Sequence, residues 1–327
     1  MRFAKILCLL LCLALLSGCG PANTPADTPS NSTGSAESIG TGESTGTGES
    51  TGTTESTGAA DDSDTLKILA IGGSFSIDAM EYLYQIAQDG GVKKIVLGNL
   101  YNGGATLGRH VNFAISDAPN YTYYKNTTGT WEATDNYKLS QALEDEDWDY
   151  ITMQQNSGSS GKDYTYEDAL PKLIQYVRER NTSAKLVWHM TWAYQADYRE
   201  GSFSAYGNDQ MKMYNMILDC IKDYVLTEDQ ISFVIPAGTA IQNARTSFIG
   251  DTLTRDGFHL DMEIGRYIAG LTWYAAITGS PVDNITYNPS PENISDEMLA
   301  VAREAATNAV ANPYEVTQSA FTEGTRP

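Results

Sequence analysis

The sequence predicts an α/β fold in which one mostly parallel sheet lies between two layers of helices. Short apolar runs alternate with longer segments that carry apolar side chains at helical spacing. This alternation continues over residues 65–315, roughly 250 residues, which is enough for one domain with a substantial core. Strands that alternate with helices pair in parallel and are covered on both faces. Right-handed crossovers then give a doubly wound three-layer sandwich.

Five apolar runs are the expected strands of a five-stranded, mostly parallel sheet. They occupy residues 67–72, 94–97, 148–153, 185–189 and 231–235. Two further runs flank a Thr-Thr-Gly turn and predict a hairpin insertion, with strands at residues 121–126 and 130–134.

The helices expected between the strands each carry one apolar stripe. Leu170, Leu173, Ile174 and Val177, for example, fall on one face of a helix over residues 166–180. The expected helices cover residues 77–88, 106–115, 136–143, 166–180, 209–224, 240–245, 262–277 and 295–311.

Residues 1–19 predict an export signal. Arg2 and Lys5 precede an apolar run at residues 6–16, which is shorter than the roughly 20 residues that span a bilayer. The following run LSGC resembles the bacterial lipobox, in which the Cys, here Cys19, is diacylated and becomes the new N-terminus. Two acyl chains hold a protein stably on a membrane. We therefore expect an extracytoplasmic protein, anchored through Cys19 at the cell surface or the periplasmic face. Ordinary secretion with an incidental Cys is the alternative.

Residues 20–64 predict a flexible linker ahead of the domain at residues 65–315, and a short tail follows at residues 316–327. The linker consists almost entirely of Ser, Thr, Gly, Pro, Ala and acidic residues, and Glu-Ser-Thr-Gly recurs at a six-residue period. Such a segment buries too little apolar surface to offset the entropy lost on ordering. A coil of this length reaches roughly 35–40 Å on average.

The net charge and the cysteine content argue against a nucleic-acid partner and against an internal disulfide. A net charge of −20 argues against a nucleic-acid partner, because a phosphate backbone needs a basic surface. Of the four cysteines, two belong to the signal peptide, one is Cys19, and only Cys220 remains in the domain. A single Cys cannot form an internal disulfide, and its apolar helical context predicts a core residue.

The first candidate site is the run IGGSFS at residues 71–76, where the first strand ends. Functional residues of such sheets lie at the carboxyl ends of the strands. The glycines allow a sharp turn, and Ser74 then stands at the start of a helix with free N–H groups. Alternatively, Ser74 or Ser76 only caps that helix. The loop lacks a Walker Lys and a complete Gly-x-Gly-x-x-Gly pattern, so a nucleotide site is not expected.

The second candidate site is the run RDGFHL at residues 255–260. Asp256 lies three residues before His259 and can bond one ring N–H of His259, which leaves the other nitrogen free to take a proton. The alternative is a capping or surface His. Neither His110 nor His189 has ligand spacing to Asp or Glu, so no metal or other cofactor is expected.

Together, the Ser after the first strand and the late Asp-x-x-His pair resemble the SGNH, or GDSL-type, hydrolases. Residues 99–107 (NLYNGGATL) resemble the second block of that family, and residues 149–157 (DYITMQQNS) stand where its third block belongs. The four blocks follow in order across almost the whole domain. The closing residues 256–274 are similar to a largely uncharacterised branch, which often begins Gly-Asn-Ser-Phe and carries a Gln-Gln pair in the third block. The resemblance implies a flavodoxin-like α/β/α sandwich with esterase activity.

The resemblance also implies a role for each motif residue. Ser74 would be the nucleophile, His259 the general base and Asp256 the residue that orients it. The oxyanion would be held by the backbone N–H of Ser74, by that of Gly104, with Gly103 as second choice, and by a side-chain amide.

Two positions depart from the family pattern. Gly73 replaces the Asp or Asn that usually precedes the nucleophile, which should change local hydrogen bonding. The third block lacks its usual Gly and reads Gln154-Gln155-Asn156. A simple alignment favours Asn156 as the oxyanion donor, whereas the branch pattern favours a Gln. We expect Gln155 first and Asn156 close behind, since either amide can donate an N–H.

The sequence therefore predicts a lipid-anchored esterase that removes acyl groups, acetyl above all, from carbohydrate. A tethered surface lipoprotein meets polysaccharides, and many SGNH relatives remove O-acetyl groups from them. The expected partners are an acylated glycan or other ester and, through Cys19, the membrane. Lipid or short-chain esters are alternative substrates. A non-catalytic carbohydrate-binding protein on the same fold and an O-acyltransferase are alternative functions.

Overall fold

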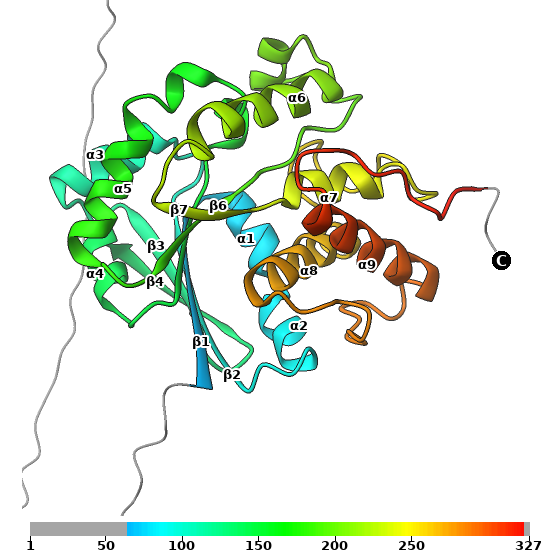
Figure 1. The fold of residues 1–327 in the computed structure, drawn as a ribbon, viewed down its shortest axis with the longest axis horizontal. Helices are drawn as coiled ribbons and strands as arrows, with labels where there is room; N and C mark the ends of the chain where they lie inside the picture. Colours follow the sequence, from blue (N-terminus) through cyan, green and yellow to red (C-terminus); the bar gives the residue numbers. More distant parts are fainter. Residues whose placement is uncertain (1–63, 324–327) are drawn as a thin grey trace, which may run out of the picture. The chain divides into compact units, whose positions relative to one another are not determined.

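The computed structural model describes residues 64–323 of the chain. A seven-stranded sheet in the order β4-β3-β2-β1-β5-β6-β7 runs through this part, and helices cover both faces of the sheet (Figure 1). The predicted α/β three-layer fold is thus confirmed. The predicted signal peptide with Cys19 lies outside the described residues, as does the predicted linker except for Asp64.

The five predicted parallel strands are all present. The central strand is buried on both faces, because six of its eight residues point into one or the other helix layer. It pairs in parallel with β2 on one side and β5 on the other, and β6 and β7 continue the parallel order. The strands are β1 (Thr65–Gly72), β2 (Lys94–Tyr101), β5 (Tyr150–Met153), β6 (Lys185–His189) and β7 (Ile231–Ile235).

The predicted hairpin is also present, but it extends the sheet instead of standing apart from it. β3 (Tyr121–Asn126) pairs antiparallel with β2, and β4 (Trp131–Tyr137) pairs antiparallel with β3. The expected count of five strands is therefore wrong. The hairpin pairs with backbone N–H and C=O groups along β2, which would otherwise form an open sheet edge.

The helices divide between the two faces of the sheet (Figure 1). One layer holds α1 (Ser74–Met80), α2 (Leu83–Asp89), α7 (Ala237–Ala244), α8 (Ile264–Thr278) and α9 (Asp296–Ala311). The other holds α3 (Leu107–Ser116), α4 (Leu139–Glu144), α5 (Ala169–Arg180) and α6 (Gln210–Cys220). Among the described residues, no helix combines the length and the apolar character that crossing a bilayer requires.

Three helix predictions need correction. The helix expected at residues 77–88 is two helices, α1 and α2, and the first begins earlier than expected, at Ser74. The helix expected from residue 136 begins at Leu139, since β4 continues to Tyr137. The helix expected at residues 209–224 ends at Cys220 and is followed by a π-helical turn, Ile221–Val225.

Two buried histidines should make the fold sensitive to acid. Burial lowers the pKa of His110 to about 4, with the nearby Arg109 adding to the effect, and burial lowers the pKa of His189 to about 3. In the unfolded chain both groups take up protons near pH 6.5. Below that pH the unfolded state binds more protons, so the free energy of unfolding should fall as the pH drops toward 4, by at most about 3 kcal/mol per pH unit.

Urea unfolding at several pH values between about 7 and 4.5 tests this expectation. The urea concentration at the midpoint of unfolding should fall steadily as the pH drops below about 6.5. In His189→Gln this decrease with pH should be roughly half as steep, because only His110 then takes up a proton on unfolding. A wild-type midpoint that does not change over this range would contradict it.

Candidate active site

The predicted site residues come from separate loops that meet beside the start of α1. Ser74 is the first residue of α1 and is separated from the end of β1 by Gly73, and Gly104 lies in the loop after β2. Asn156 lies in the loop after β5, and His259 lies in the segment between α7 and α8. The three strand-end loops share one edge of the sheet because β1, β2 and β5 are parallel neighbours.

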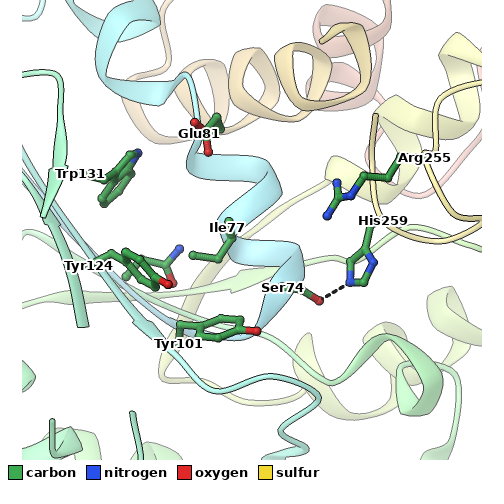
Figure 2. A pocket seen from close by; sticks show the side chains of 9 residues that line it. Ser74, Ile77, Glu81, Tyr101, Tyr124, Trp131, Arg255 and His259 are labelled. Atoms are coloured by element: carbon green, nitrogen blue, oxygen red, sulfur yellow. Dashed lines mark hydrogen bonds between the residues drawn. The ribbon is translucent and has the colours of Figure 1, made fainter. Parts of the chain in front are cut away.

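Ser74, His259 and Asp256 form a continuous hydrogen-bonded chain. Ser74 Oγ lies 2.8 Å from His259 Nε2 (Figure 2). His259 Nδ1 lies 2.6 Å from Asp256 Oδ2. The predicted contacts among these three side chains are thus present, although Ser74 and His259 are 185 positions apart in the sequence. The alternative in which Ser74 caps its helix is not supported, because Gly73 is the N-cap residue and no side chain caps α1.

The Asp256 carboxylate holds the histidine loop in one shape. Its Oδ1 accepts the backbone N–H groups of Phe258 at 3.2 Å and His259 at 2.8 Å, while Oδ2 accepts the ring N–H of His259. Burial acts to raise the pKa of Asp256, but the hydrogen bonds from the ring and backbone of His259 and from Phe258 outweigh it and lower that pKa. A charged Asp256 keeps the proton on Nδ1, so Nε2 presents a lone pair to Ser74.

The loop after β2 brings the backbone N–H of Gly104 close to Gly73, the residue before the serine. Gly104 has φ = +66°, the left-handed region that favours glycine. A β-carbon added to Gly73 would lie 3.8 Å from the Gly104 nitrogen, and one added to Gly104 would lie 3.9 Å from Asn156 Nδ2. Gly103, the second choice from the sequence, instead adjoins the hydroxyl of Tyr101.

The contacts of Gln155 do not support the expected oxyanion role. Gln155 Oε1 accepts the backbone N–H groups of Leu107 at 3.0 Å and Asn156 at 2.8 Å, which fixes the orientation of the amide. Its Nε2 donates to Thr165, to Oγ1 at 3.0 Å and to the backbone oxygen at 3.4 Å. Both N–H groups therefore have partners, and the side chain joins two loops inside the protein. Gln154 is also turned inward, with Oε1 3.0 Å from His189 Nδ1.

Asn156 has the free donor that Gln155 lacks. Its Oδ1 accepts the backbone N–H of Gly158 at 3.1 Å and caps a short 3₁₀ turn. Within residues 64–323, its Nδ2 has no recorded hydrogen-bond partner, and it lies beside Gly104. These contacts favour Asn156 over Gln155 as the oxyanion donor, the opposite of the order expected from the sequence.

Comparisons with known proteins place the chain in a family without assigning an activity. Residues 67–309 match the model of a domain of unknown function, DUF4886. The chain belongs to the DUF4886 family. A crystal structure of a DUF4886 family protein from Bacteroides uniformis has a TM-score of 0.74 and is 44% identical, and the match covers 78% of this chain and 98% of that one. No curated protein matches the sequence.

Two more distant structures also match the DUF4886 domain. A proposed SGNH hydrolase from Slackia heliotrinireducens is 19% identical with a TM-score of 0.43, covering 65% of this chain and 99% of its own. A family 3 carbohydrate esterase from Clostridium thermocellum is 12% identical with a TM-score of 0.40, covering 64% of this chain and 94% of its own.

Sequence reasoning missed the residue that fastens the histidine loop of this DUF4886 protein to α1. Asp78, one turn after Ser74, is fully buried. It accepts the backbone N–H of Leu260 at 3.0 Å, Arg255 Nη1 at 3.0 Å, and Arg266 at 2.9 Å from Nε and 2.8 Å from Nη2. Asp78 therefore holds the chain on both sides of His259. An acidic residue in the otherwise apolar stretch SIDAM was the available signal.

A cavity of about 460 Å³ opens beside Ser74 and His259 in the DUF4886 domain (Figure 2). This volume lies in the range of about 300–1,000 Å³ that is typical of ligand sites. The residues that line it are Ser74, Ile77, Glu81, Asn99, Tyr101, Tyr124, Trp131, Arg255 and His259.

Proposed function

We propose that this DUF4886 protein is an extracytoplasmic serine esterase that removes acyl groups, acetyl above all, from carbohydrate. The hydrogen-bonded chain from Ser74 through His259 to Asp256 carries the proposal. A Ser and a His in contact, with the His oriented by a carboxylate, are the arrangement that activates a serine hydroxyl. Ser74 and His259 also line a cavity that is large enough for a substrate.

The proposed reaction begins when Ser74 Oγ attacks the ester carbonyl carbon while His259 Nε2 takes the hydroxyl proton. The negative oxygen that forms is held by the backbone N–H groups of Ser74 and Gly104 and by the Asn156 amide, in place of Gln155. His259 then gives the proton taken from Ser74 to the leaving sugar oxygen as the C–O bond breaks and the acyl-enzyme forms. Water attacks the acyl-enzyme while His259 takes a proton from it, and His259 returns that proton to Ser74 Oγ as the bond to the acyl group breaks and the acid leaves.

The choice of carbohydrate rests on a proposed location. We also propose that Cys19 is diacylated and that residues 20–64 tether the domain, so the enzyme would meet polysaccharides outside the cytoplasm. Metabolic labelling with an alkyne fatty acid tests the anchor: the full-length chain should be labelled in bacteria, and Cys19→Ser should not. Equal labelling of both would reject lipid attachment at Cys19.

A fluorophosphonate probe tests the enzyme against a non-catalytic binding protein. The probe should label the wild-type protein at Ser74, and His259→Ala should greatly slow the labelling, because the serine is then not activated. The wild type should also release acetate from an acetylated polysaccharide. Glycan binding with neither labelling nor acetate release would favour the binding protein. Transfer of the acetyl group to an added sugar alcohol, in preference to water, would identify a transferase.

Asn156→Ser should separate the two candidate oxyanion donors. Serine keeps an oxygen that can cap the turn at Gly158 but has no amide to reach the oxyanion. We expect kcat for p-nitrophenyl acetate to fall by roughly 10²- to 10³-fold with little change in KM, since the contact exists only in the transition state. Thermal unfolding should shift little.

Gln155→Met is the matched comparison for Asn156→Ser. It removes the neighbouring amide but keeps its length, so it should mainly lower the unfolding temperature, because the N–H groups of Leu107 and Asn156 lose their acceptor. A larger loss of kcat in the Gln155 variant than in the Asn156 variant, measured well below both unfolding temperatures, would restore Gln155 as the donor.

A further inference from the structure

The cavity extends away from Ser74 along the sheet. Tyr101 at the end of β2, Tyr124 on β3 and Trp131 on β4 line it on three successive strands. Ile77 on α1 and Glu81, the residue that follows α1, line its opposite wall. Figure 2 shows Trp131 and Glu81 at the end remote from Ser74. The hairpin that extends the sheet past β2 thus supplies the far part of the cavity.

The aromatic residues on this hairpin fall into two sets. Tyr121 and Tyr123 point to the face of α3 and α4 and are buried, with their hydroxyls 2.8 Å from His110 Nδ1 and 2.7 Å from Asp145 Oδ2. Tyr124 points to the other face, as alternation along a strand requires. Tyr124, Trp131 and Tyr101 are only partly buried and line the cavity. The two buried tyrosines pack inside the protein, whereas the three cavity-lining residues expose aromatic surface to the cavity.

The cavity wall suits a sugar better than an acyl chain. Ile77 is the only aliphatic side chain in the lining, and the remaining residues are aromatic or polar. The C–H groups on one face of a pyranose ring stack on the electron-rich face of an aromatic ring. Hydroxyl groups at the rim of the sugar need donors and acceptors, which a purely apolar groove would not provide.

Two charged residues supply such donors and acceptors. Arg255 uses Nη1 to bind Asp78 but keeps 34% of its side chain exposed, and its guanidinium points into the cavity (Figure 2). Glu81 binds Arg266 through Oε2 and is 33% exposed. In the lining of the cavity the negative charge of Glu81 offsets the positive charge of Arg255, which favours a neutral sugar.

We propose that the β3–β4 hairpin is a glycan-binding platform, in which Trp131 stacks on a sugar ring beyond the acylated ring held at Ser74. The inference rests on the proposed esterase function and specifies its substrate as an acylated, neutral oligosaccharide. A short ester occupies only the Ser74 end of the cavity. Trp131 therefore determines specificity and takes no part in the chemistry.

The test compares two substrates in three variants. Trp131→Ala should raise KM for O-acetylated xylo-, manno- or chito-oligosaccharides by roughly fivefold to fiftyfold. It should change kcat/KM for p-nitrophenyl acetate by less than about twofold, because that ester does not reach Trp131. Trp131→Phe should recover part of the affinity. Glu132→Ala, at the next position on the same edge strand and outside the cavity, is the matched control and should match wild type.

A binding measurement separates failure of the platform from failure of the esterase. Titration calorimetry of Ser74→Ala with the same oligosaccharides should show binding that is weakened when Trp131→Ala is added. Binding that depends on Trp131 without hydrolysis by the wild type would reject the esterase and keep the platform. Hydrolysis that depends on Ser74, with KM unaffected by Trp131→Ala, would keep the esterase and overturn the platform. If none of these oligosaccharides binds, the platform is also overturned.

Discussion

Ser74→Ala should lower kcat for p-nitrophenyl acetate by roughly 10⁴- to 10⁶-fold. In the wild type, His259 Nε2 lies 2.8 Å from Ser74 Oγ and can take its proton. The alanine variant lacks Oγ, so His259 has no nucleophile to activate. The remaining activity would come from the oxyanion donors and from substrate binding alone. Measured under conditions of substrate saturation, this loss reports on chemistry and not on affinity.

Ser76→Ala is the matched control for Ser74→Ala. It removes a hydroxyl two residues along the same helix, but Ser76 Oγ is buried and donates within the fold, 2.8 Å from Gly73 O and 2.9 Å from Asn99 Oδ1. Its loss should cost about 1 kcal/mol of stability and change kcat by less than about tenfold. If wild type and Ser74→Ala hydrolyse the ester at equal rates, Ser74 is not the nucleophile.

The sequence could predict those parts of the site that depend on short-range patterns. Asp256 and His259 are three residues apart, so their contact required only one loop. Ser74 follows an apolar strand, and the carboxyl end of such a strand is where the sheet of an α/β fold presents functional residues. The contact between Ser74 and His259 spans 185 positions, and it could be expected only from the resemblance to a known order of motifs.

The choice between Gln155 and Asn156 could not be made from the sequence. Both are amides with the same donors, and they are adjacent in the chain. Gln155 turns inward because Leu107, 48 positions away, offers a backbone N–H that needs an acceptor. That requirement arises only when the loops after β2 and β5 are packed together. The hairpin was similarly recognisable by its turn, whereas its pairing with β2 depended on the tertiary fold.

Asp78 illustrates a third kind of residue that sequence patterns conceal. An isolated acidic residue on a helix is usually solvated, so its type alone gave no reason to expect burial. Arg255 and Arg266, which make that burial possible, come from more than 170 positions further along the chain. With both arginines bound, the buried Asp78 carboxylate holds the segment that carries His259 against the helix that carries Ser74.

Asp78→Ala should lower the free energy of unfolding by about 3–5 kcal/mol, because it removes the carboxylate that Arg255 and Arg266 share and leaves the buried Arg266 with Glu81 as its one remaining ion-pair partner among the described residues. This is a large fraction of the roughly 5–15 kcal/mol that stabilises a typical domain. Asp78→Asn should cost less, since its amide oxygen can still accept the Leu260 N–H. Urea unfolding at pH 7 measures both. Asp168→Asn, which removes an exposed ion pair with Lys172 at 3.2 Å, should change stability by about 0.5 kcal/mol or less.

Activity separates a positioning role of Asp78 from a purely structural one. In Asp78→Asn, well below its unfolding temperature, the loop at Leu260 loses the charged partner that fixes Arg255, and His259 Nε2 is held less closely to Ser74. We expect kcat and the rate of fluorophosphonate labelling to fall together by roughly tenfold or more, with KM for p-nitrophenyl acetate little changed, because misplacing a catalytic group mainly affects the chemical step. A stability loss with unchanged kcat and labelling rate would show that Asp78 supports the fold alone.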